Sequence, residues 1–187
     1  YDGPGYRYST GHTSGIDVSG VNTRLTMIRS VLDGGGQFPE GINVSDGATL
    51  EMSHSAIRFH HHSDFGVLYW KPAVPSIDFA ISVIDASATI DECMLDHAGG
   101  GGLNSSNSRL VLSRSRITQN VDWRGEIGIY AYNCIGSIHD CMVTGKFGVS
   151  GDMDVRNCTL TRRWPSAVPY IGFGDDVQVS NSIIWDA

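Results

Sequence analysis

A short pattern that recurs seven times constrains the fold of this 187-residue chain more than any other feature. Each copy has the order apolar, any, apolar, any, any, Ser or Cys, any, apolar. The copies are LTMIRSVL (25–32), LEMSHSAI (50–57), ATIDECML (88–95), LVLSRSRI (110–117), GSIHDCMV (136–143), MDVRNCTL (153–160) and VQVSNSII (177–184). Their starts lie 25, 38, 22, 26, 17 and 24 residues apart, so the chain is a repeat of irregular period.

A second block, Gly followed by an apolar residue, accompanies the first pattern. It occurs in GIDV (15–18), GINV (41–44), GVLY (66–69), GLN (102–104), GIYA (128–131), GVSG (148–151) and GFG (172–174). Together the blocks give three short strands per repeat, with alternating apolar residues and no helical period. We therefore predict an all-β fold, a right-handed parallel β-helix of about seven coils.

The length fits a single domain, residues 1–187. The longest interval between copies predicts an insertion or long loop at about residues 70–86. Because the chain begins with Tyr1 and no capping helix is visible, we expect it to be part of a longer chain. Neighbouring coils or domains of that chain, or an oligomer, would then cover the strand edges at its ends.

The repeat also predicts which side chains of each coil point to the interior, namely those at its apolar positions. The expected inward residues of two consecutive coils are Leu25, Met27 and Leu32, then Leu50, Met52 and Ile57. Coils stack about 4.8 Å apart, so like residues form ladders along the axis. The Ser/Cys position is expected to be a ladder of small buried residues where the chain bends: Ser30, Ser55, Cys93, Ser115, Cys141, Cys158 and Ser182. Cys134 has no place in it.

Composition excludes two classes of partner. The net charge is −7, and the 13 Lys and Arg residues form no basic stripe, so we expect no nucleic acid binding. No apolar run approaches the roughly 18 residues of a membrane span. The 23 glycines and 18% charged residues are typical of extracellular all-β proteins, so we expect a secreted or cell-surface location.

The coil pattern, as in VRNCTL (155–160) and VSNSIIW (179–185), resembles the β-helix repeats of the pectin-lyase-like superfamily, especially in secreted and surface-anchored bacterial proteins. The resemblance covers the chain from about residue 15. It implies a ligand cleft on the outer face of the first sheet, walled by the long loops. The outward residues there would be Asp17, Asn43, Leu68, Asn104, Tyr130, Ser150 and Gly174. The superfamily includes polysaccharide lyases, polygalacturonases, phage tailspikes and adhesins, so fold does not decide activity.

One candidate site lies in FHHHSDFGVLYW (59–70). If the backbone there is extended, His60, His62 and Asp64 share the outer face. Two imidazoles and a carboxylate at this spacing could hold a transition metal. A corner between the two strands would break the alternation. A solvated polar loop, a contact with a glycan and an acid–base role are the alternatives.

A second candidate is GFGDDV (172–177), which resembles the Gly-Asp-Asp element of polygalacturonases. There, paired carboxylates protonate the leaving oxygen and activate water. Asp175 and Asp176 would take these roles. The companion motifs Asn-Thr-Asp, Gly-His-Gly and Arg-Ile-Lys are absent, so the alternative is a simple turn.

Lyase chemistry would need a base together with a cation or Ca²⁺. The cationic groups expected on the loop side are Lys146, Arg124, Arg162 and Arg163. The acidic loops could bind Ca²⁺ through oxygen ligands, although no cofactor is firmly predicted. Surface charge is the alternative for all of these residues.

Aromatic residues also concentrate in the expected cleft-side loops, where exposed rings stack on sugars. They are Trp70, Trp123, Trp164, Tyr130, Tyr132 and Tyr170, and His97 lies beside a glycine run. Packing of the loops onto the β-helix explains the positions of the rings equally well. Two hypotheses stay open. The first is a non-catalytic structural or adhesive module that binds a polysaccharide or cell-surface glycan. The second is a carbohydrate-active enzyme, either a polysaccharide lyase or a glycoside hydrolase, or a fragment of one.

Overall fold

The computed structural model describes residues 14–33, 40–59, 79–97, 101–119, 127–161 and 171–185. Every regular element in these ranges is a β-strand. Within them, no helix is present that could cross a membrane.

The strands form three parallel sheets of seven strands each. The first sheet contains β1 (Ser14–Ser19), β4 (Glu40–Ser45), β7 (Phe79–Ile84), β10 (Gly101–Ser106), β13 (Ile127–Tyr132), β16 (Lys146–Val149) and β19 (Ile171–Phe173). The second contains β2 (Arg24–Ile28), β5 (Thr49–Ser53), β8 (Ser87–Asp91), β11 (Arg109–Ser113), β14 (Ile135–His139), β17 (Met153–Arg156) and β20 (Gln178–Ser180). The third contains β3 (Val31–Asp33), β6 (Ala56–Phe59), β9 (Met94–His97), β12 (Arg116–Gln119), β15 (Met142–Thr144), β18 (Thr159–Thr161) and β21 (Ile183–Trp185).

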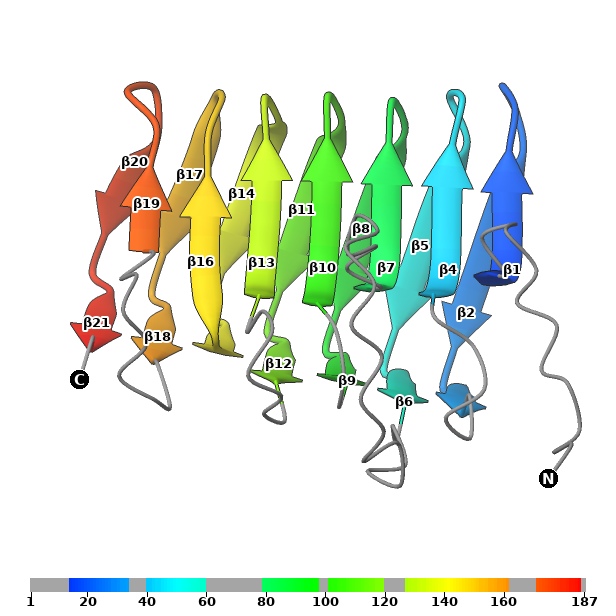
Figure 1. Cartoon of the computed structure of the whole chain (residues 1–187), viewed down its shortest axis with the longest axis horizontal. Helices are drawn as coiled ribbons and strands as arrows, with labels where there is room; N and C mark the ends of the chain where they lie inside the picture. The colour runs from blue at the N-terminus through cyan, green and yellow to red at the C-terminus, as the bar shows by residue number, and fades with distance from the viewer. Residues whose placement is uncertain are drawn as a thin grey trace, which may run out of the picture.

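Each coil gives one strand to each sheet, and every strand pairs with its equivalent in the next coil. Figure 1 shows the first-sheet strands side by side, pointing the same way, with β1 and β19 at opposite ends of the row. The second-sheet strands return behind them. The predicted right-handed parallel β-helix of seven coils is therefore confirmed.

The core is a set of apolar ladders inside the coils. Leu50, Met52 and Ile57 are buried as predicted, and their counterparts in the first coil line up with them in register. Leu25 and Leu32 of that coil are only partly buried. Fully burying one such side chain contributes about 1.5–3 kcal/mol. Stacking of like residues thus supplies the main stabilisation of the fold.

The predicted Ser/Cys ladder lies at the corner between the second and third sheets, here called the second corner. Each hydroxyl or thiol donates to the carbonyl two residues before it, as Ser115 does to Ser113 at 2.6 Å. At several steps the same oxygen accepts the N–H of the ladder residue in the preceding coil. Ser115 Oγ accepts from Cys93 N–H at 3.0 Å, and Ser55 Oγ accepts from Ser30 N–H at 3.1 Å. A small polar atom therefore satisfies buried backbone groups at each bend.

The residue before each ladder position has a left-handed backbone. These residues are Arg29, His54, Glu92, Arg114, Asp140, Asn157 and Asn181, with φ between 46° and 57°. Such a conformation costs roughly 1–2 kcal/mol for most L-residues. A single left-handed residue is enough to turn the chain, so the second corner is tight. The side chain of that residue points to solvent.

Cys134, which the repeat left unassigned, belongs to a second ladder at the corner between the first and second sheets, here called the first corner. Its thiol donates to the carbonyl of Tyr132 at 3.4 Å, the same bond that Ser108 makes to Ser106 at 2.6 Å. Asn107 and Asn133 precede these residues, and both have positive φ. The same chemistry therefore builds both corners.

The structure corrects the alignment of the first sheet in two places. Within the range 70–86, expected to be a long insertion, residues 79–84 form β7. The outward row runs Asp17, Asn43, Ser82, Asn104, Tyr130, Gly148 and Gly172. Ser82 thus fills the place expected for Leu68, which lies outside the described residues. Ser150 and Gly174 lie beyond the ends of their strands instead of in this row.

The recurring Gly of the second block has a steric cause at two positions. A Cβ on Gly128 would lie 2.6 Å from the Val143 side chain, and one on Gly102 would lie 2.3 Å from that of Ile117. Both contacts join the start of a first-sheet strand to the third-sheet strand of the same coil. Glycine therefore allows the two sheets to meet closely at this edge.

Candidate functional site

Most of the predicted site residues lie outside the described parts of the chain. These are the proposed metal ligands His60, His62 and Asp64, the cations Arg124, Arg162 and Arg163, and the aromatic residues Trp70 and Trp123. His97 is the last residue of β9, and only its backbone is described. Their roles stay predictions.

Lys146, Asp175 and Asp176 are described, and the structure separates Lys146 from the two aspartates, which lie together in one turn. Lys146 begins β16 at the loop end of the first sheet. The two aspartates occupy a turn after β19, closed by the Val177 N–H to the Gly174 carbonyl at 3.1 Å. β16 has 4 residues and therefore spans about 13 Å at 3.3 Å per residue, and this length separates its first residue, Lys146, from the end of the sheet where the aspartates lie. Lys146 and the aspartates are therefore not brought together as one acid–base pair.

The described residues also contain no group of three or more His, Cys, Asp or Glu side chains that could hold a metal ion. The metal hypothesis thus rests only on the residues of the 59–70 stretch.

The outer face of the first sheet carries polar ladders. Asn43 donates to the Asp17 carboxylate at 3.3 Å, and Asn104 donates to the Ser82 hydroxyl at 3.3 Å. Both bonds join adjacent coils. They fix the two side-chain amides, which are half-buried, and Ser82 itself is buried.

Tyr130 and Tyr132 project from this same face. They lie two residues apart on β13, so they point to the same side, and their exposed fractions are 41% and 56%. Asn104 and Ser106 of β10 are their register neighbours on one side, and Gly148 is the neighbour of Tyr130 on the other. The result is a pair of exposed rings on a rigid sheet, bordered by polar groups.

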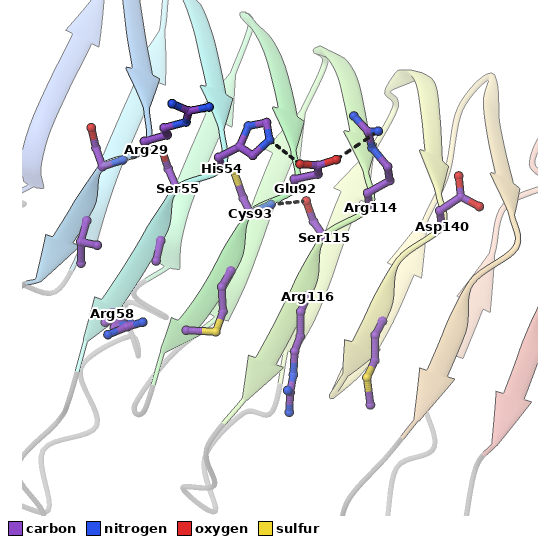
Figure 2. A pocket seen from close by; sticks show the side chains of 15 residues that line it. Arg29, His54, Ser55, Arg58, Glu92, Cys93, Arg114, Ser115, Arg116 and Asp140 are labelled. Carbon is purple, nitrogen blue, oxygen red and sulfur yellow. Dashed lines mark hydrogen bonds and ion pairs between the residues drawn. The ribbon is translucent and has the colours of Figure 1, made fainter.

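A second surface is a shallow groove of about 760 Å³ along the second corner. One rim carries the left-handed residues Arg29, His54, Glu92, Arg114 and Asp140, and the third sheet provides the floor. Figure 2 shows these rim side chains following one another from coil to coil, with Arg58 and Arg116 below them on the third sheet. The floor includes Val31, Ala56, Met94 and Met142.

Ion pairs connect the rim residues of three consecutive coils. Glu92 contacts His54 Nε2 with one carboxylate oxygen at 2.5 Å and Arg114 Nη1 with the other at 3.1 Å. Arg114 also donates its Nε to Asp91 Oδ1 at 2.9 Å and forms a second contact with the other oxygen of Asp91. Asp140 pairs with His139 at 2.9 Å and accepts from Asn157 at 3.0 Å.

These pairs change the acidity of the carboxyl groups. The hydrogen bonds from Arg114, partly opposed by burial, lower the pKa of Asp91 to about 2. Hydrogen bonds from His139 and Asn157 lower the pKa of Asp140. Both groups are therefore ionised over the physiological range, and their negative charge is already matched by neighbouring donors.

The four thiols are free and buried, and three of them lie in the second-corner ladder. Burial raises the pKa of Cys93. The hydrogen bond with Cys158, together with burial, raises the pKa of Cys141. Both Cys93 and Cys141 stay protonated at neutral pH, which supports the structural role predicted for them.

The groove residues were missed in the sequence, although a signal for them exists. The residue directly before each ladder Ser or Cys is polar in all seven copies of the repeat. Packing of the core does not require a polar residue at this position. Polar residues that precede a small residue at a bend indicate a left-handed corner whose side chain faces solvent.

The chain matches no protein-family model, and no curated protein or solved structure is significantly similar to it.

Proposed function

We propose that this protein is a secreted or cell-surface module with a structural or adhesive role, which binds a glycan on the outer face of its first sheet. The proposal includes kinship with the pectin-lyase-like superfamily, on the basis of its coil pattern. The observation that carries it is the pair of exposed rings Tyr130 and Tyr132 on one face of β13.

Two rings on one rigid face suit stacking on sugars. An exposed tyrosine offers an apolar face to the C–H groups of a pyranose ring and a hydroxyl to its oxygens. Asn104 and Ser106 lie beside the rings in register, where they can donate to sugar hydroxyls. Because the sheet holds all of these groups in place, binding would cost little ordering of the protein.

A catalytic set that combines Lys146 with Asp175 and Asp176 is disfavoured by their separation, and the companion motifs of the polygalacturonase element are absent, so a non-catalytic role is favoured. Lys146 lies at one end of the first-sheet strands, and Asp175 and Asp176 lie at the other. General acid–base catalysis needs both groups within hydrogen-bond reach of one bond in the substrate.

The test is retention on immobilised neutral and acidic polysaccharides. We expect the double variant Tyr130→Ala, Tyr132→Ala to lose retention, and Tyr130→Phe, Tyr132→Phe to keep most of it, because the rings remain. Ile135→Ala is the matched control, since Ile135 is an exposed apolar residue of the same coil on another sheet.

Two outcomes would contradict the proposal. Equal retention of the wild type and the alanine double variant would show that the rings do not bind. Release of unsaturated products by the wild-type protein would show that it is a lyase, and new reducing ends without unsaturation would show that it is a hydrolase.

A further inference from the structure

We infer that the groove along the second corner is a separate binding site for an acidic polysaccharide, whose carboxylate or sulfate groups pair with Arg29, Arg58 and Arg116. This site lies on a different face from Tyr130 and Tyr132. It goes beyond the proposed function and does not depend on those rings.

The groove concentrates positive charge on an acidic protein. Four arginines and two acidic residues line it, whereas the whole chain has a net charge of −7. Asp33 and Asp96 flank Arg58 along the third sheet and moderate the charge at that point. The lining itself still has an excess of guanidinium groups.

The acidic residues of the groove are already engaged, and three of its arginines are not. Glu92 uses both carboxylate oxygens, on His54 and Arg114. Asp140 is held by His139 and Asn157, and Arg114 is held by Asp91 and Glu92. By contrast, Arg29, Arg58 and Arg116 take part in no ion pair between residues that the structure describes. Arg116 donates only its Nε, to Thr118 at 3.2 Å. Guanidinium groups bind carboxylate and sulfate oxygens in bidentate fashion.

The arrangement of these arginines fits an elongated ligand. Arg29 belongs to the first coil, Arg58 to the second and Arg116 to the fourth, so they span about 14 Å along the axis at 4.8 Å per coil. Figure 2 shows them along the length of the groove instead of gathered at one point. A polymer with a charge in its repeating unit can reach all three. The apolar floor of Ala56, Met94 and Met142 can pack against the C–H faces of sugar rings.

A polysaccharide fits this surface better than an acidic peptide. An extended peptide usually binds by pairing its backbone with a free strand edge. In the groove, the backbone groups of β6, β9, β12 and β15 are already paired with a neighbouring coil on each side, and of the groove strands only β3 is an edge strand of the described sheet. A ligand there meets side chains only, so its anionic groups must provide the specific contacts.

The test compares two triple variants with the same change in net charge. The groove variant is Arg29→Gln, Arg58→Gln, Arg116→Gln. The control is Arg24→Gln, Arg109→Gln, Arg156→Gln, whose three arginines lie on the second sheet. Binding to polygalacturonate and to dextran sulfate is measured by affinity electrophoresis, with neutral dextran as the uncharged probe. We expect the groove variant to bind the anionic polymers at least about tenfold more weakly, and the control to stay within about twofold of the wild type.

Three results would overturn the inference. Equal weakening in both variants would show that only net charge matters. Equally tight binding of poly-L-glutamate, lost in the groove variant, would make this a surface for acidic peptides. Binding that is lost with the alanine substitutions at Tyr130 and Tyr132, and kept in the groove variant, would assign the acidic polymer to the first sheet. That last result would leave the proposed function intact.

Because all three groove arginines face solvent, a thermal melt of each variant is expected to match the wild type.

Discussion

At the scale of single residues, each bend of the second corner depends on two adjacent positions with different duties. The left-handed residue turns the chain, and its side chain is free to vary because it faces solvent. In the inner coils the following Ser or Cys is buried, and its side chain bonds backbone groups. Ser115, for example, bonds the Ser113 carbonyl and the Cys93 N–H. The first position therefore tolerates charge, and the second tolerates only a small donor.

Replacement of Ser115 tests the role of the buried ladder residue in bonding the backbone. Ser115→Ala leaves the buried Cys93 N–H without a partner and removes one of two hydrogen bonds to the Ser113 carbonyl, which still accepts the Glu92 N–H at 3.1 Å. We therefore expect it to lower the free energy of unfolding by about 1–3 kcal/mol. Ser115→Cys is expected to cost less, because cysteine fills the same position in three other coils. Urea denaturation followed by circular dichroism measures both.

Ser87→Ala is the control for this comparison, since Ser87 lies on the outer side of the second sheet. It is expected to change stability by less than about 0.5 kcal/mol. If Ser115→Cys were as destabilising as Ser115→Ala, hydrogen bonding by the ladder thiols would not explain their presence.

The sequence predicted the buried ladder because Ser and Cys recur at a fixed distance from the apolar positions. It did not predict the place of Cys134, since the first corner varies in length and lacks one shared pattern. Asp46 is followed by Gly47 before the buried Ala48, whereas Asn133 is followed directly by Cys134. A single inserted residue hides the equivalence in the sequence without changing the fold.

At the scale of strands, ion pairs at the corners hold particular coils in register. Asp91, the last residue of β8, and Arg114, directly after β11, join the third and fourth coils by a bidentate contact. Ser113 adds a hydrogen bond to the same carboxylate at 2.6 Å. This contact supplements the backbone ladder between the two strands.

The Asp91 contact predicts a specific dependence of stability on pH. The pKa of Asp91 is about 2 in the folded protein, below the value of about 3.9 in an unfolded chain. A lowered pKa stabilises the fold above the unfolded value, and this contribution is lost as the pH falls from about 4 to 2. Asp91→Asn is therefore expected to lower the free energy of unfolding at pH 7 by about 1 kcal/mol, a small value because solvent screens the contact. Near pH 2 the expected loss is much smaller.

Urea midpoints of the wild type and Asp91→Asn between pH 2 and 7 give the measurement. Asp154→Asn serves as the control, because its contact with Arg156 is longer, at 3.6 Å. A difference between wild type and Asp91→Asn that did not change with pH would exclude the ionised carboxylate as its source.

Strand positions were predictable wherever the alternation of apolar residues is uninterrupted, and this holds for the second and third sheets. The first sheet was harder to align. In the second block, Gly148 of GVSG does not open a strand: it pairs with Tyr130 in mid-strand, because only Gly145 separates β15 from β16. A turn this short moves the strand start upstream to Lys146. The candidate groove was not predicted, because its rim and floor come from different parts of the repeat and meet only when coils stack.

At the scale of the whole molecule, stability is expected to vary along the axis. Each coil contacts only its neighbours, so inner coils are supported on both sides. Leu112 lies between Ile90 and Ile138, and all three are fully buried. Val179 of the last described coil pairs with Val155 on one side, and its exposed fraction is 40%.

Truncation of a core side chain should therefore lower the free energy of unfolding more in an inner coil than in the last described coil. Leu112→Ala is expected to lower the free energy of unfolding by about 2–5 kcal/mol, and Val179→Ala by less than about 1 kcal/mol. Urea denaturation gives both values, and hydrogen exchange locates the loss along the chain. Leu112→Met, which preserves volume, should cost less than about 1.5 kcal/mol. Equal costs for the two alanine variants would contradict a gradient along the axis.

The left-handed corner has one more consequence, for how such a surface can change over evolution. Backbone geometry makes the bend, so side chains as different as Arg29, Glu92 and Asn181 occupy equivalent places. The corner thus works as a row of interchangeable sites at a fixed pitch of about 4.8 Å. A substitution there can change the charge and hydrogen-bonding groups of the row without changing the core. Duplication of a coil would lengthen the row while keeping its pitch.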